Sequence, residues 1–454
     1  MLRLHDTATG AVRPLELREP GTVSVYVCGV TVSDVPHVGH GRFSLVWDVV
    51  RRYLEWSGLQ VRYVSNITDV DDKIIARAER EGRKPAEVAE EYERAWYDTM
   101  DRLGVRRPDD DPHATSYIDR MVELVGELVG RGVAYETGDG VYLSVADVPG
   151  YGLLARQDLD SLRAGARIEV DDAKRSPLDF AVWKKAKPGE PSWPSPWGEG
   201  RPGWHTECVV MSLDLLGEGF ELHGGGLDLA FPHHENERAQ AVALGKRFAG
   251  HWVHNGLVVV AGGEKMGKSL GNTLDLARLL RSHDPRAYRL LVLRSHYRSP
   301  IVVTETEIAD AAAALRRLDT VFRRAAEVGL AAAAPDAEVL ERFRGHMDND
   351  LNTPPAMGLL FEQVRRANTL LDTEDDDSAA TVLGTIAAVA SAVGLAVGQD
   401  EVEAPDEAAL AVARRRDGAR AAGDWGAADA ARDELVRLGY VVEDGPAGTS
   451  LRRR

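Results

Sequence analysis

The chain has 454 residues, too many for one domain of ordinary size and enough for about three. Apolar residues make up 44% and charged residues 28%, a globular composition that excludes a largely disordered protein. The net charge of −17 argues against a surface that binds nucleic acid everywhere, but it is compatible with a local basic face. Two cysteines exclude a disulfide framework and fit a reducing cytosol.

The sequence predicts neither a signal peptide nor a membrane span. Its first 14 residues lack the apolar stretch of a signal peptide, and we expect a cytoplasmic protein. Ser378 to Gln399 is uncharged and long enough to cross a bilayer. It consists mainly of Ala, Gly, Thr and Ser, so its transfer into lipid would be poor. This segment is therefore predicted to be a core helix of a bundle.

The first part of the chain alternates between strand and helix. Thr22–Cys28 and Leu59–Ile67 are rich in β-branched and aromatic residues and predict two strands. Between them, apolar residues recur at helical spacing: Phe43, Val46, Val50, Tyr53 and Leu54. Such a βαβ unit implies a parallel sheet, in which ligands bind beyond the carboxyl ends of the strands.

The composition changes several times further along the chain. Residues 131–186 have the short, mixed pattern of an insertion, and residues 188–204 contain three Trp, which predicts a loop packed against the protein. Gly256–Ala261 predicts a strand that returns to the sheet. Residues 308–395 are helical in pattern. The last unit, 408–454, has nine Arg against seven acidic residues, a net charge of +2.

His37-Val38-Gly39-His40 follows the first predicted strand and opens the first predicted helix. A helix N-terminus presents unpaired N–H groups and the positive end of the helix dipole, which favour phosphate. Two imidazoles there can donate to phosphate oxygens, and Gly39 has no side chain to block a nucleobase. We therefore favour a phosphate site over a turn with two surface histidines.

Gly262–Ser269 (GGEKMGKS) matches the P-loop pattern and follows a predicted strand. A P-loop helix must run on from its lysine, whereas here Gly271 and Asn272 interrupt it, and Thr273 is the expected N-cap of the next helix. We therefore predict a loop whose Lys265 and Lys268 reach ATP phosphates, rather than a P-loop NTPase.

Two further patterns stay open on spacing alone. His233 and Glu237 stand four residues apart on one helix face, and with Cys28 and Cys208 they form a set that suits zinc. Two buried free thiols and a solvated helix face are the favoured alternative, since the cysteines lie 180 residues apart. His223-Gly224-Gly225-Gly226 with Asp228 would let backbone approach a ribose or adenine, although a lone Gly run is more often a turn.

Together these motifs resemble the cysteinyl-tRNA synthetases, a family of class I aminoacyl-tRNA synthetases. HVGH is similar to their HIGH signature, and Lys265–Ser269 (KMGKS) is similar to their KMSKS loop. Other stretches match in order: Asn66–Lys73, Gly200–Cys208, His223–Glu237, Ser295–Ile301 and Asp348–Ala356. The resemblance covers essentially the whole chain and reverses the preference against the metal.

The resemblance implies an α/β fold. We expect a Rossmann-type parallel-sheet catalytic domain with an inserted domain, followed by an α-helical bundle and a small C-terminal anticodon-binding domain. The expected boundaries are 1–130 and 201–262 for the catalytic halves, 131–200 for the inserted domain, 263–307 for the KMSKS-type loop and stem-contact region, 308–397 for the bundle and 408–454 for the anticodon-binding domain.

The resemblance also implies activity and site residues. The enzyme would activate L-cysteine with Mg-ATP and transfer it from the adenylate to the 3′ end of tRNA-Cys, as a monomer. One zinc, which would bind the substrate thiolate, would be held by Cys28, Cys208, His233 and Glu237. The amino-acid pocket would be lined by Cys28, Thr68 and Trp204. The catalytic residues would be His37, His40, Lys265 and Lys268. ATP would be bound by Gly39, His40, Gly225, Asp228 and Lys268.

The chain departs from the family pattern at a few positions. Val30 and Ser33 stand where Pro and Tyr are usual, Gly267 replaces the Ser of KMSKS, and Gly448–Arg452 lacks the usual Trp. Alternatives are a specialised or inactive paralogue and a cysteine ligase of the mycothiol pathway, whose acceptor is an amino sugar.

The final unit distinguishes the amino-sugar ligases, which lack it. Here Trp425, Arg432, Asp433 and the Arg tail resemble the anticodon-binding domain and favour tRNA. Trp425 is expected either to stack on a base or to fill a small core.

Overall fold

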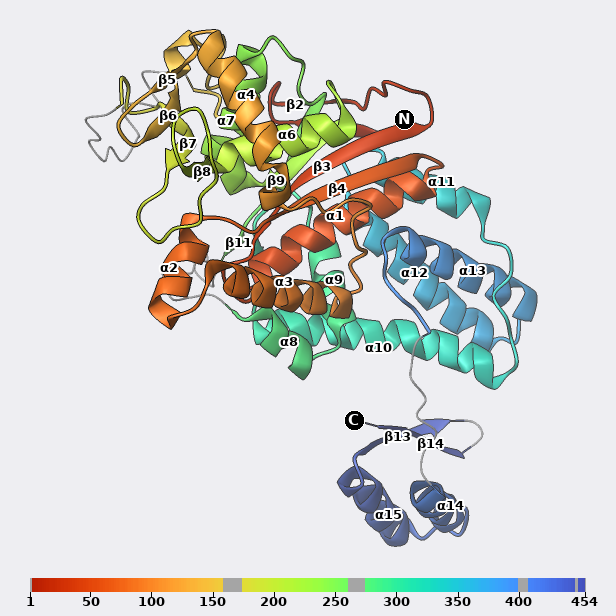
Figure 1. The fold of residues 1–454 in the computed structure, drawn as a ribbon. Helices are drawn as coiled ribbons and strands as arrows, with labels where there is room; N and C mark the ends of the chain where they lie inside the picture. The colour runs from red at the N-terminus through yellow and green to blue at the C-terminus, as the bar shows by residue number, and fades with distance from the viewer. Residues whose placement is uncertain (1, 158–173, 260–273, 399–406, 446–447, 454) are drawn as a thin grey trace. The chain divides into compact units, whose positions relative to one another are not determined.

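The computed structural model describes residues 2–157, 174–259, 274–398, 407–445 and 448–453 (Figure 1). The chain forms two compact units, Met1–Val397 and Gly398–Arg454. Lys265 and Lys268 lie outside the described residues.

The larger unit is built around a parallel sheet of four strands in the order β10-β9-β3-β4. These strands are β3 (Thr22–Thr31), β4 (Gln60–Thr68), β9 (Leu222–Gly226) and β10 (His251–Asn255). Helix α1 (Val38–Trp56) connects β3 to β4, which confirms the predicted βαβ unit. Because the chain leaves central β3 first toward β4 and later toward β9, the order switches between β3 and β9, where ligands bind in such sheets.

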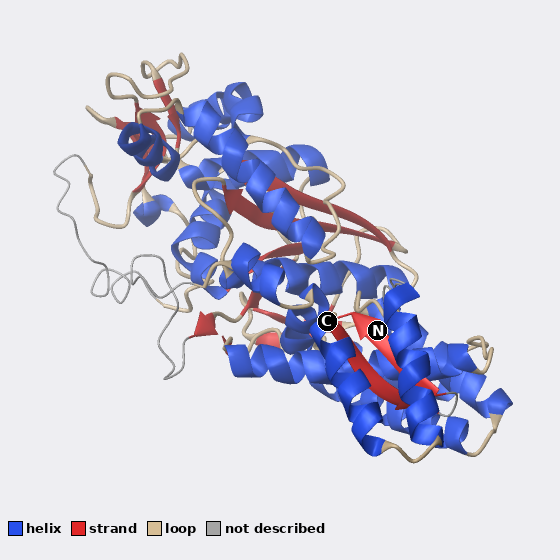
Figure 2. Ribbon diagram, turned by 90° about the horizontal axis from the view of Figure 1, so that it is seen from below, coloured by secondary structure: helices blue, strands red, loops and turns tan. Residues whose placement is uncertain are grey.

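Helices cover both faces of this sheet (Figure 2). Helix α1 lies on one face with α3 (Pro85–Arg102), and helix α6 (Trp204–Leu216) packs on the other with α4 (Ile118–Gly130) (Figure 1). Buried on both sides, β3 is an almost unbroken apolar run, as parallel strands are. Trp47 of α1 packs so tightly on the sheet that a β-carbon on Gly224 would lie 1.8 Å from its ring.

A second, antiparallel sheet comes from the segment predicted to be an insertion. Its strands, in the order β5-β6-β7-β8, are Ala134–Glu136, Gly140–Leu143, Phe180–Lys185 and Gly200–Pro202. Trp197 of the Trp-rich loop is buried with its ring centroid 6.3 Å from that of Trp183 on β7. The prediction that this loop packs against the protein is therefore confirmed.

The strand expected at Gly256–Ala261 does not join the central sheet, so this prediction is wrong about its pairing partner. Only Val258–Val259 forms a strand (β11) in the part of this segment that the structure describes, and it pairs with Ile301–Val302 (β12) in a separate two-stranded sheet. The Gly256 N–H donates to the Tyr297 carbonyl at 2.8 Å, which ties the chain to that neighbouring segment. The strand that returns to the central sheet is β10, just before.

The helix after the lysine-bearing segment also begins later than expected. Helix α8 (Leu276–Ser282) has Asp275 as its N-cap, with the Asp275 side chain accepting the Arg278 N–H at 3.0 Å. Thr273, the expected cap, lies outside the described residues. A carboxylate oxygen serves as well as a hydroxyl for capping.

A helical bundle follows in the larger unit. The bundle contains α10 (Glu305–Glu327), α11 (Ala337–Met347), α12 (Thr353–Asp372) and α13 (Asp376–Ala392), preceded by α9 (Pro285–Leu293). Most of α13 is buried, which confirms the uncharged segment as a core helix. In the described parts of the chain, every helix is too short or too polar to cross a membrane. The other α-helices and strands described in this unit are β1 (Arg3–Asp6), β2 (Ala11–Pro14), α2 (Asp72–Glu81) and α7 (Glu235–Ala243).

The smaller unit pairs two helices with a hairpin. These are α14 (Glu407–Ala421), α15 (Trp425–Arg437), β13 (Tyr440–Gly445) and β14 (Gly448–Arg453). Its core is made of Ala409, Val412, Ala413, Ala431, Leu435 and Tyr440. Trp425 is 64% exposed, so the expectation that it fills this core is wrong: Tyr440 supplies the large side chain instead.

Candidate active site at the carboxyl ends of the central strands

Cys28, Cys208, His233 and Glu237 converge in the interior of the larger unit. All four are buried, and one potential ligand atom of each lies within 4.8 Å of the others. Cys28 belongs to β3, Cys208 to α6, and Glu237 to the first turn of α7. His233 precedes α7 in the π-helical turn Ala230–His234. The fold thus brings together two cysteines that are 180 residues apart in the sequence.

The site lies where the two central strands stop pairing. The register of β3 with β9 runs to Val27 opposite Gly224, and Cys28 is the next residue of β3. Beyond such a point the two strands no longer fill the space between them, as expected at a topological switch point.

Glu237 is the electrostatic centre of the cluster. Its Oε1 lies 2.7 Å from His233 Nε2, and its Oε2 lies 2.6 Å from His223 Nε2. Burial raises the pKa of Glu237, but His223 and His233 outweigh it and hold the pKa well below its usual range. In return Glu237 and Cys208 overcome the effect of burial on His233 and raise its pKa to about 10.

The two thiols respond in opposite directions. Burial, with Cys208 and Glu237 as neighbours, raises the pKa of Cys28 well above its usual value. Burial also disfavours the Cys208 thiolate. Its hydrogen bonds to Cys28 and to His233 nevertheless lower the pKa of Cys208 overall. Two sulfurs, an imidazole and a carboxylate, all buried and close together, form a donor set that fits zinc.

His223 was missed as part of this cluster. With Cys28, His234 and Glu237 it forms a second, overlapping group whose ligand atoms also lie within 4.8 Å of one another. His223 had been assigned only to the Gly run. His223 lies on β9 opposite Tyr26 of β3, two residues before Cys28. The sequence could indicate this proximity only if the pairing of β9 with β3 were already known.

The two remaining residues predicted for the amino-acid pocket adjoin the cluster. Trp204, the first residue of α6, stacks on the His233 ring with centroids 3.9 Å apart. Thr68, the last residue of β4, is buried, and its Oγ1 lies 2.9 Å from Glu207 Oε2 and 3.2 Å from Asn66 Nδ2. The Cys208 thiol donates to Asn66 Oδ1 at 3.6 Å, which connects Thr68 to the cluster.

His37 and His40 form the N-terminal cap of α1. The His37 Nδ1 accepts the His40 N–H, and the His40 Nδ1 accepts the His37 N–H, both at 3.3 Å. The rings stack with centroids 3.7 Å apart. Because each Nδ1 accepts a hydrogen bond, the proton of each neutral ring is on Nε2. The prediction that this motif opens the first helix is confirmed.

The described residues that flank the lysine-bearing segment 260–273 contact this cap or the helix that follows it. Before it, the Arg42 guanidinium of α1 donates to the Leu257 carbonyl at 2.7 Å. After it, the Val38 N–H donates to the Leu274 carbonyl at 3.1 Å, and the Leu276 N–H donates to the Pro36 carbonyl at 3.1 Å. The chain therefore leaves and rejoins the described structure beside the HVGH motif.

The glycine run has a packing role. Trp47 occupies the space beside Gly224, and a β-carbon on Gly225 would lie 2.9 Å from His234 Cε1. Asp228 follows in the exposed 3-10 turn Leu227–Leu229. The closeness of Gly225 to a ligand thus remains a prediction, whereas its contact with His234 is a structural reason for glycine there.

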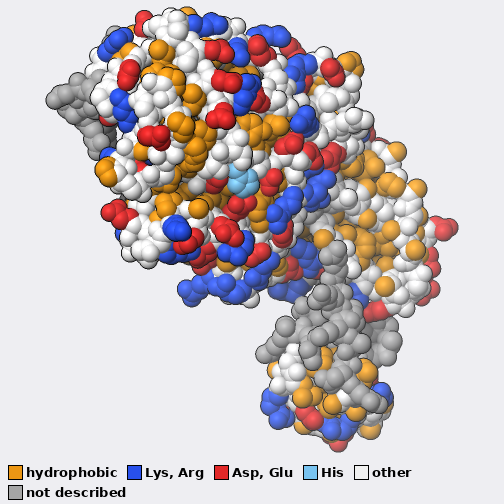
Figure 3. All heavy atoms as spheres, in the orientation of Figure 1, with side chains coloured by type: hydrophobic (Ala, Val, Ile, Leu, Met, Phe, Trp, Pro, Cys, Tyr) orange, Lys and Arg blue, Asp and Glu red, His pale blue; other side chains and the backbone are white. Residues whose placement is uncertain are grey.

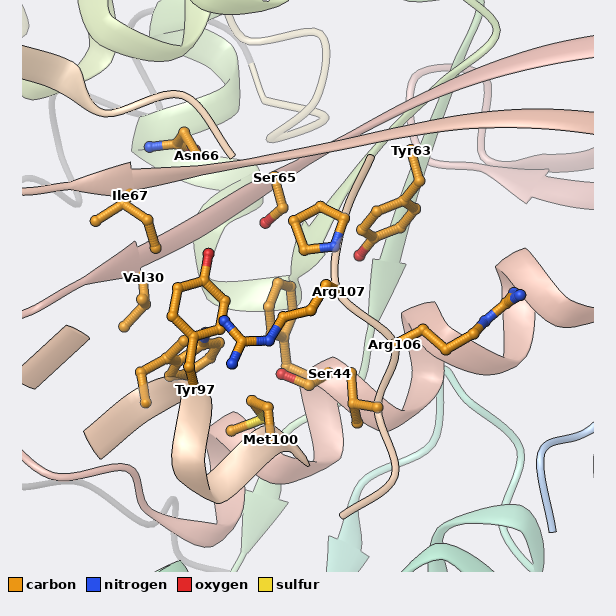
Figure 4. Close-up of a pocket in the computed structure, with 14 residues that line it drawn as sticks. Val30, Ser44, Tyr63, Ser65, Asn66, Ile67, Tyr97, Met100, Arg106 and Arg107 are labelled. Atoms are coloured by element: carbon orange, nitrogen blue, oxygen red, sulfur yellow. The ribbon is translucent and has the colours of Figure 1, made fainter. Parts of the chain in front are cut away.

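A cavity lies on the other face of β4, between α1, α3 and residues 105–108. Figure 4 shows Ser65 pointing into this cavity and Asn66 pointing away from it. Successive residues of a strand face opposite sides, so the cavity is separated from the cysteine cluster by the strand itself.

Basic side chains gather on part of the surface in spite of the acidic total. Lys and Arg cluster over α8 and the end of α3 on the face seen in Figure 3. Arg102, Arg278 and Arg281 are exposed there, and Arg102 donates to the Leu280 carbonyl at 3.3 Å. The local basic face left open by the composition is therefore present.

Comparison with known proteins identifies the class and then the family. The tRNA synthetases class I (C) catalytic domain matches residues 14–313, and a DALR domain matches residues 342–397. The cysteinyl-tRNA ligase anticodon binding domain matches residues 404–452. The chain is therefore a class I tRNA synthetase.

Curated relatives narrow this class to one family. The cysteine–tRNA ligase of Halorhodospira halophila is 45% identical over 100% of both chains, and that of Cronobacter sakazakii is 42% identical over 100% of both. The cysteine–tRNA ligase of Streptomyces coelicolor is 42% identical over 98% of this chain and 74% of that protein. The chain belongs to the cysteine–tRNA ligase family.

Solved structures share the fold at low sequence identity. The methionyl-tRNA synthetase of Mycobacterium tuberculosis in complex with methionyl-adenylate has a TM-score of 0.59 and 16% identity, covering 82% of this chain and 90% of that one. A LeuRS–tRNA–LeuAMS ternary complex from Agrobacterium radiobacter has a TM-score of 0.60 and 11% identity, covering 84% of each chain. The predicted α/β class I fold is confirmed.

Proposed function

We propose that this chain is a cysteine–tRNA ligase that activates L-cysteine with Mg-ATP and transfers the cysteinyl group to the 3′ end of tRNA-Cys. The observation that carries the substrate assignment is the buried Cys28, Cys208, His233 and Glu237 cluster at the switch point of the sheet. This cluster supports a zinc site, and the relatives of the chain are cysteine–tRNA ligases.

The cluster residues would hold one zinc ion. When bound, zinc supplies a Lewis-acid centre that prefers a soft thiolate to the hydroxyl of serine, so that selection of cysteine needs no separate editing site. Trp204, stacked on His233, would form one wall of the amino-acid pocket. Thr68 offers a hydroxyl beside it.

Activation joins the cysteine carboxylate to the α-phosphate of ATP and releases pyrophosphate. Negative charge on the phosphates grows as pyrophosphate leaves, and fixed donors stabilise it without reorganisation. His37 and His40, each with a proton on Nε2, provide such donors at the positive end of α1. Lys265 and Lys268 complete the set in our proposal, which is supported by the contacts of the flanking residues Leu257 and Leu274 beside the HVGH motif.

The acceptor is assigned to tRNA rather than to an amino sugar. The anticodon-domain match and the exposed Trp425 of α15 support this choice. The decisive test compares aminoacylation of tRNA-Cys with ligation of cysteine to an amino sugar on the same preparation. Charging of tRNA-Cys without amino-sugar ligation is expected, and the reverse result would overturn the assignment.

A further inference from the structure

Trp96 is a buried aromatic residue to which the proposed reaction gives no task. It lies on α3 and is 9% exposed. Its ring meets the His40 ring of the HVGH motif with centroids 5.6 Å apart and planes inclined by 75°, which is an edge-to-face contact. This contact joins the first turn of α1 to a helix from a later part of the chain.

The contacts between His40 and His37 do not fix the two rings within the domain. The His40 Nδ1 accepts the His37 N–H at 3.3 Å, near the long end of the range for hydrogen bonds. The His37 ring stacks on the His40 ring with centroids 3.7 Å apart, but His37 belongs to the same helix end and can move with it. These contacts therefore set the two rings relative to each other.

Helix α3, in contrast, is attached to the edge of the central sheet. The Tyr97 hydroxyl, next to Trp96 in the sequence, donates to Asp111 Oδ2 at 2.6 Å. The segment that carries Asp111 is bonded to β4, since the Ser65 N–H donates to the Asp110 carbonyl at 3.1 Å. Trp96 therefore places the His40 ring relative to the sheet that carries the rest of the site.

We propose that Trp96 is a positioning residue for ATP activation, which holds the His40 ring so that its Nε2–H keeps its direction toward the phosphates. The inference rests on the proposed function, because it requires His40 to donate to those phosphates. A hydrogen bond weakens steeply when its angle departs from linear. A His40 ring that turned would therefore stabilise the growing charge on pyrophosphate less well, while the binding of cysteine would be unaffected.

Replacement of the Trp96 ring tests this role. In cysteine-dependent ATP–pyrophosphate exchange, kcat of Trp96→Leu should fall roughly 10-fold, because a displaced group acts less well in the transition state. KM for cysteine should stay within about twofold. Trp96→Phe, which keeps an aromatic edge, should retain at least about half of the wild-type kcat. A normal kcat in Trp96→Leu would overturn the inference.

A double-mutant cycle shows whether Trp96 acts through His40. His40→Ala alone should lower kcat roughly 100-fold. Addition of Trp96→Leu to His40→Ala should then lower kcat by less than about twofold, since the ring to be positioned is no longer present. If the two losses multiplied in the double variant, Trp96 would act by another route and the inference would be overturned.

Met100→Ala is the matched control for lost packing. Met100 lies one turn after Trp96 on α3, is 3% exposed and lines the same cavity as Trp96 (Figure 4). This variant should lower the thermal midpoint and leave kcat unchanged in assays well below that midpoint. An equal loss of kcat in Met100→Ala and Trp96→Leu would assign the effect to packing and overturn the inference.

A second variant covers the case in which Trp96→Leu does not fold. Trp96→Met also removes the ring, and its flexible side chain fills irregular space, so the same losses and the same cycle are expected with it. Failure of the wild-type chain to catalyse cysteine-dependent exchange, or a normal rate in His40→Ala, would instead contradict the proposed function. The two failures are therefore distinguishable.

Discussion

Gly39 lies directly against the imidazole ring of His37: a β-carbon on Gly39 would be 2.9 Å from Cε1 and 3.0 Å from Nδ1 of that ring. The ring cannot turn away freely, because its Nδ1 accepts the His40 N–H at the start of α1. The His37 ring, which is proposed to contact the ATP phosphates, can therefore occupy this position only because residue 39 has no side chain.

Gly39→Ala should lower the rate of cysteine-dependent pyrophosphate exchange by at least about tenfold, because His37 must shift and phosphate contacts depend on position. Gly126→Ala on α4 is the control, since no atom lies within 4 Å of the added carbon. That variant should keep full activity and gain about 0.5–1 kcal/mol of helix stability. Equal activities for the two variants would contradict the argument.

Purified protein should contain about one zinc per chain, as expected for a four-ligand site. Cys208→Ala should raise KM for cysteine far more than KM for ATP, because only the amino acid presents a thiol to the metal. His113→Gln, which alters a histidine paired with Glu93 outside the cluster, should keep both zinc and activity. Active wild-type protein without zinc, measured by elemental analysis, would disprove the assignment.

Lys268→Ala should slow pyrophosphate exchange by roughly 100-fold, as expected when a charge contact to the transition state is lost. KM for cysteine should hardly change. Gly267→Ser should be tolerated, because it restores the family residue and removes a glycine. The surface variant Lys187→Ala controls for loss of a positive charge. A normal rate in Lys268→Ala would mean that this segment does not act on the phosphates.

Removal of residues 408–454 should leave pyrophosphate exchange near the wild-type rate, because this part lies within a separate compact unit. Transfer to tRNA-Cys should fall sharply and lose its dependence on the anticodon. Within the intact chain, Trp425→Ala should keep the unit folded, since Trp425 is 64% exposed, yet weaken charging. Tyr440→Ala should unfold the unit. Normal charging by the truncated enzyme would contradict the assignment of this unit to anticodon binding.

Asp48 of α1 and Arg289 of α9 form a buried ion pair at 2.6 Å. Burial raises the pKa of Asp48, but Arg289 and Arg52 outweigh it and lower the pKa below its ordinary value of 3.8. The stability gained from this shift is therefore present at neutral pH and is lost as pH falls below about 4.

Asp48→Asn should destabilise the larger unit by about 3–5 kcal/mol at pH 7, because Arg289 is left buried without its partner. Its thermal midpoint should also depend less on pH below about 4 than that of the wild type. Asp101→Asn, which breaks the exposed pair with Arg107, should cost about 0–1 kcal/mol. Similar losses in both variants, measured by thermal unfolding, would refute the prediction.

Local patterns predicted the elements well and their partners less well. The helical spacing from Phe43 to Leu54 predicted α1, and the small residues of α13 predicted a core helix. Gly256–Ala261 has the composition of a sheet strand, but its described part pairs with Ile301–Val302, a segment distant in the sequence, and not with the central sheet. Pairing depends on residues far apart in sequence, and periodicity does not report them.

The sequence by itself determined the class of protein and the chemistry of its site: the signature motifs, their order, and the residues able to hold a metal. Only the tertiary structure decided which of those residues meet. Cys28 and Cys208 come together because α6 packs over β3, and His223 joins them because β9 pairs with β3. It also decided that Glu207 faces Thr68 and that Trp425 stays outside its core. Residue types specify chemical capacity, whereas proximity and burial arise from the packing of the whole chain.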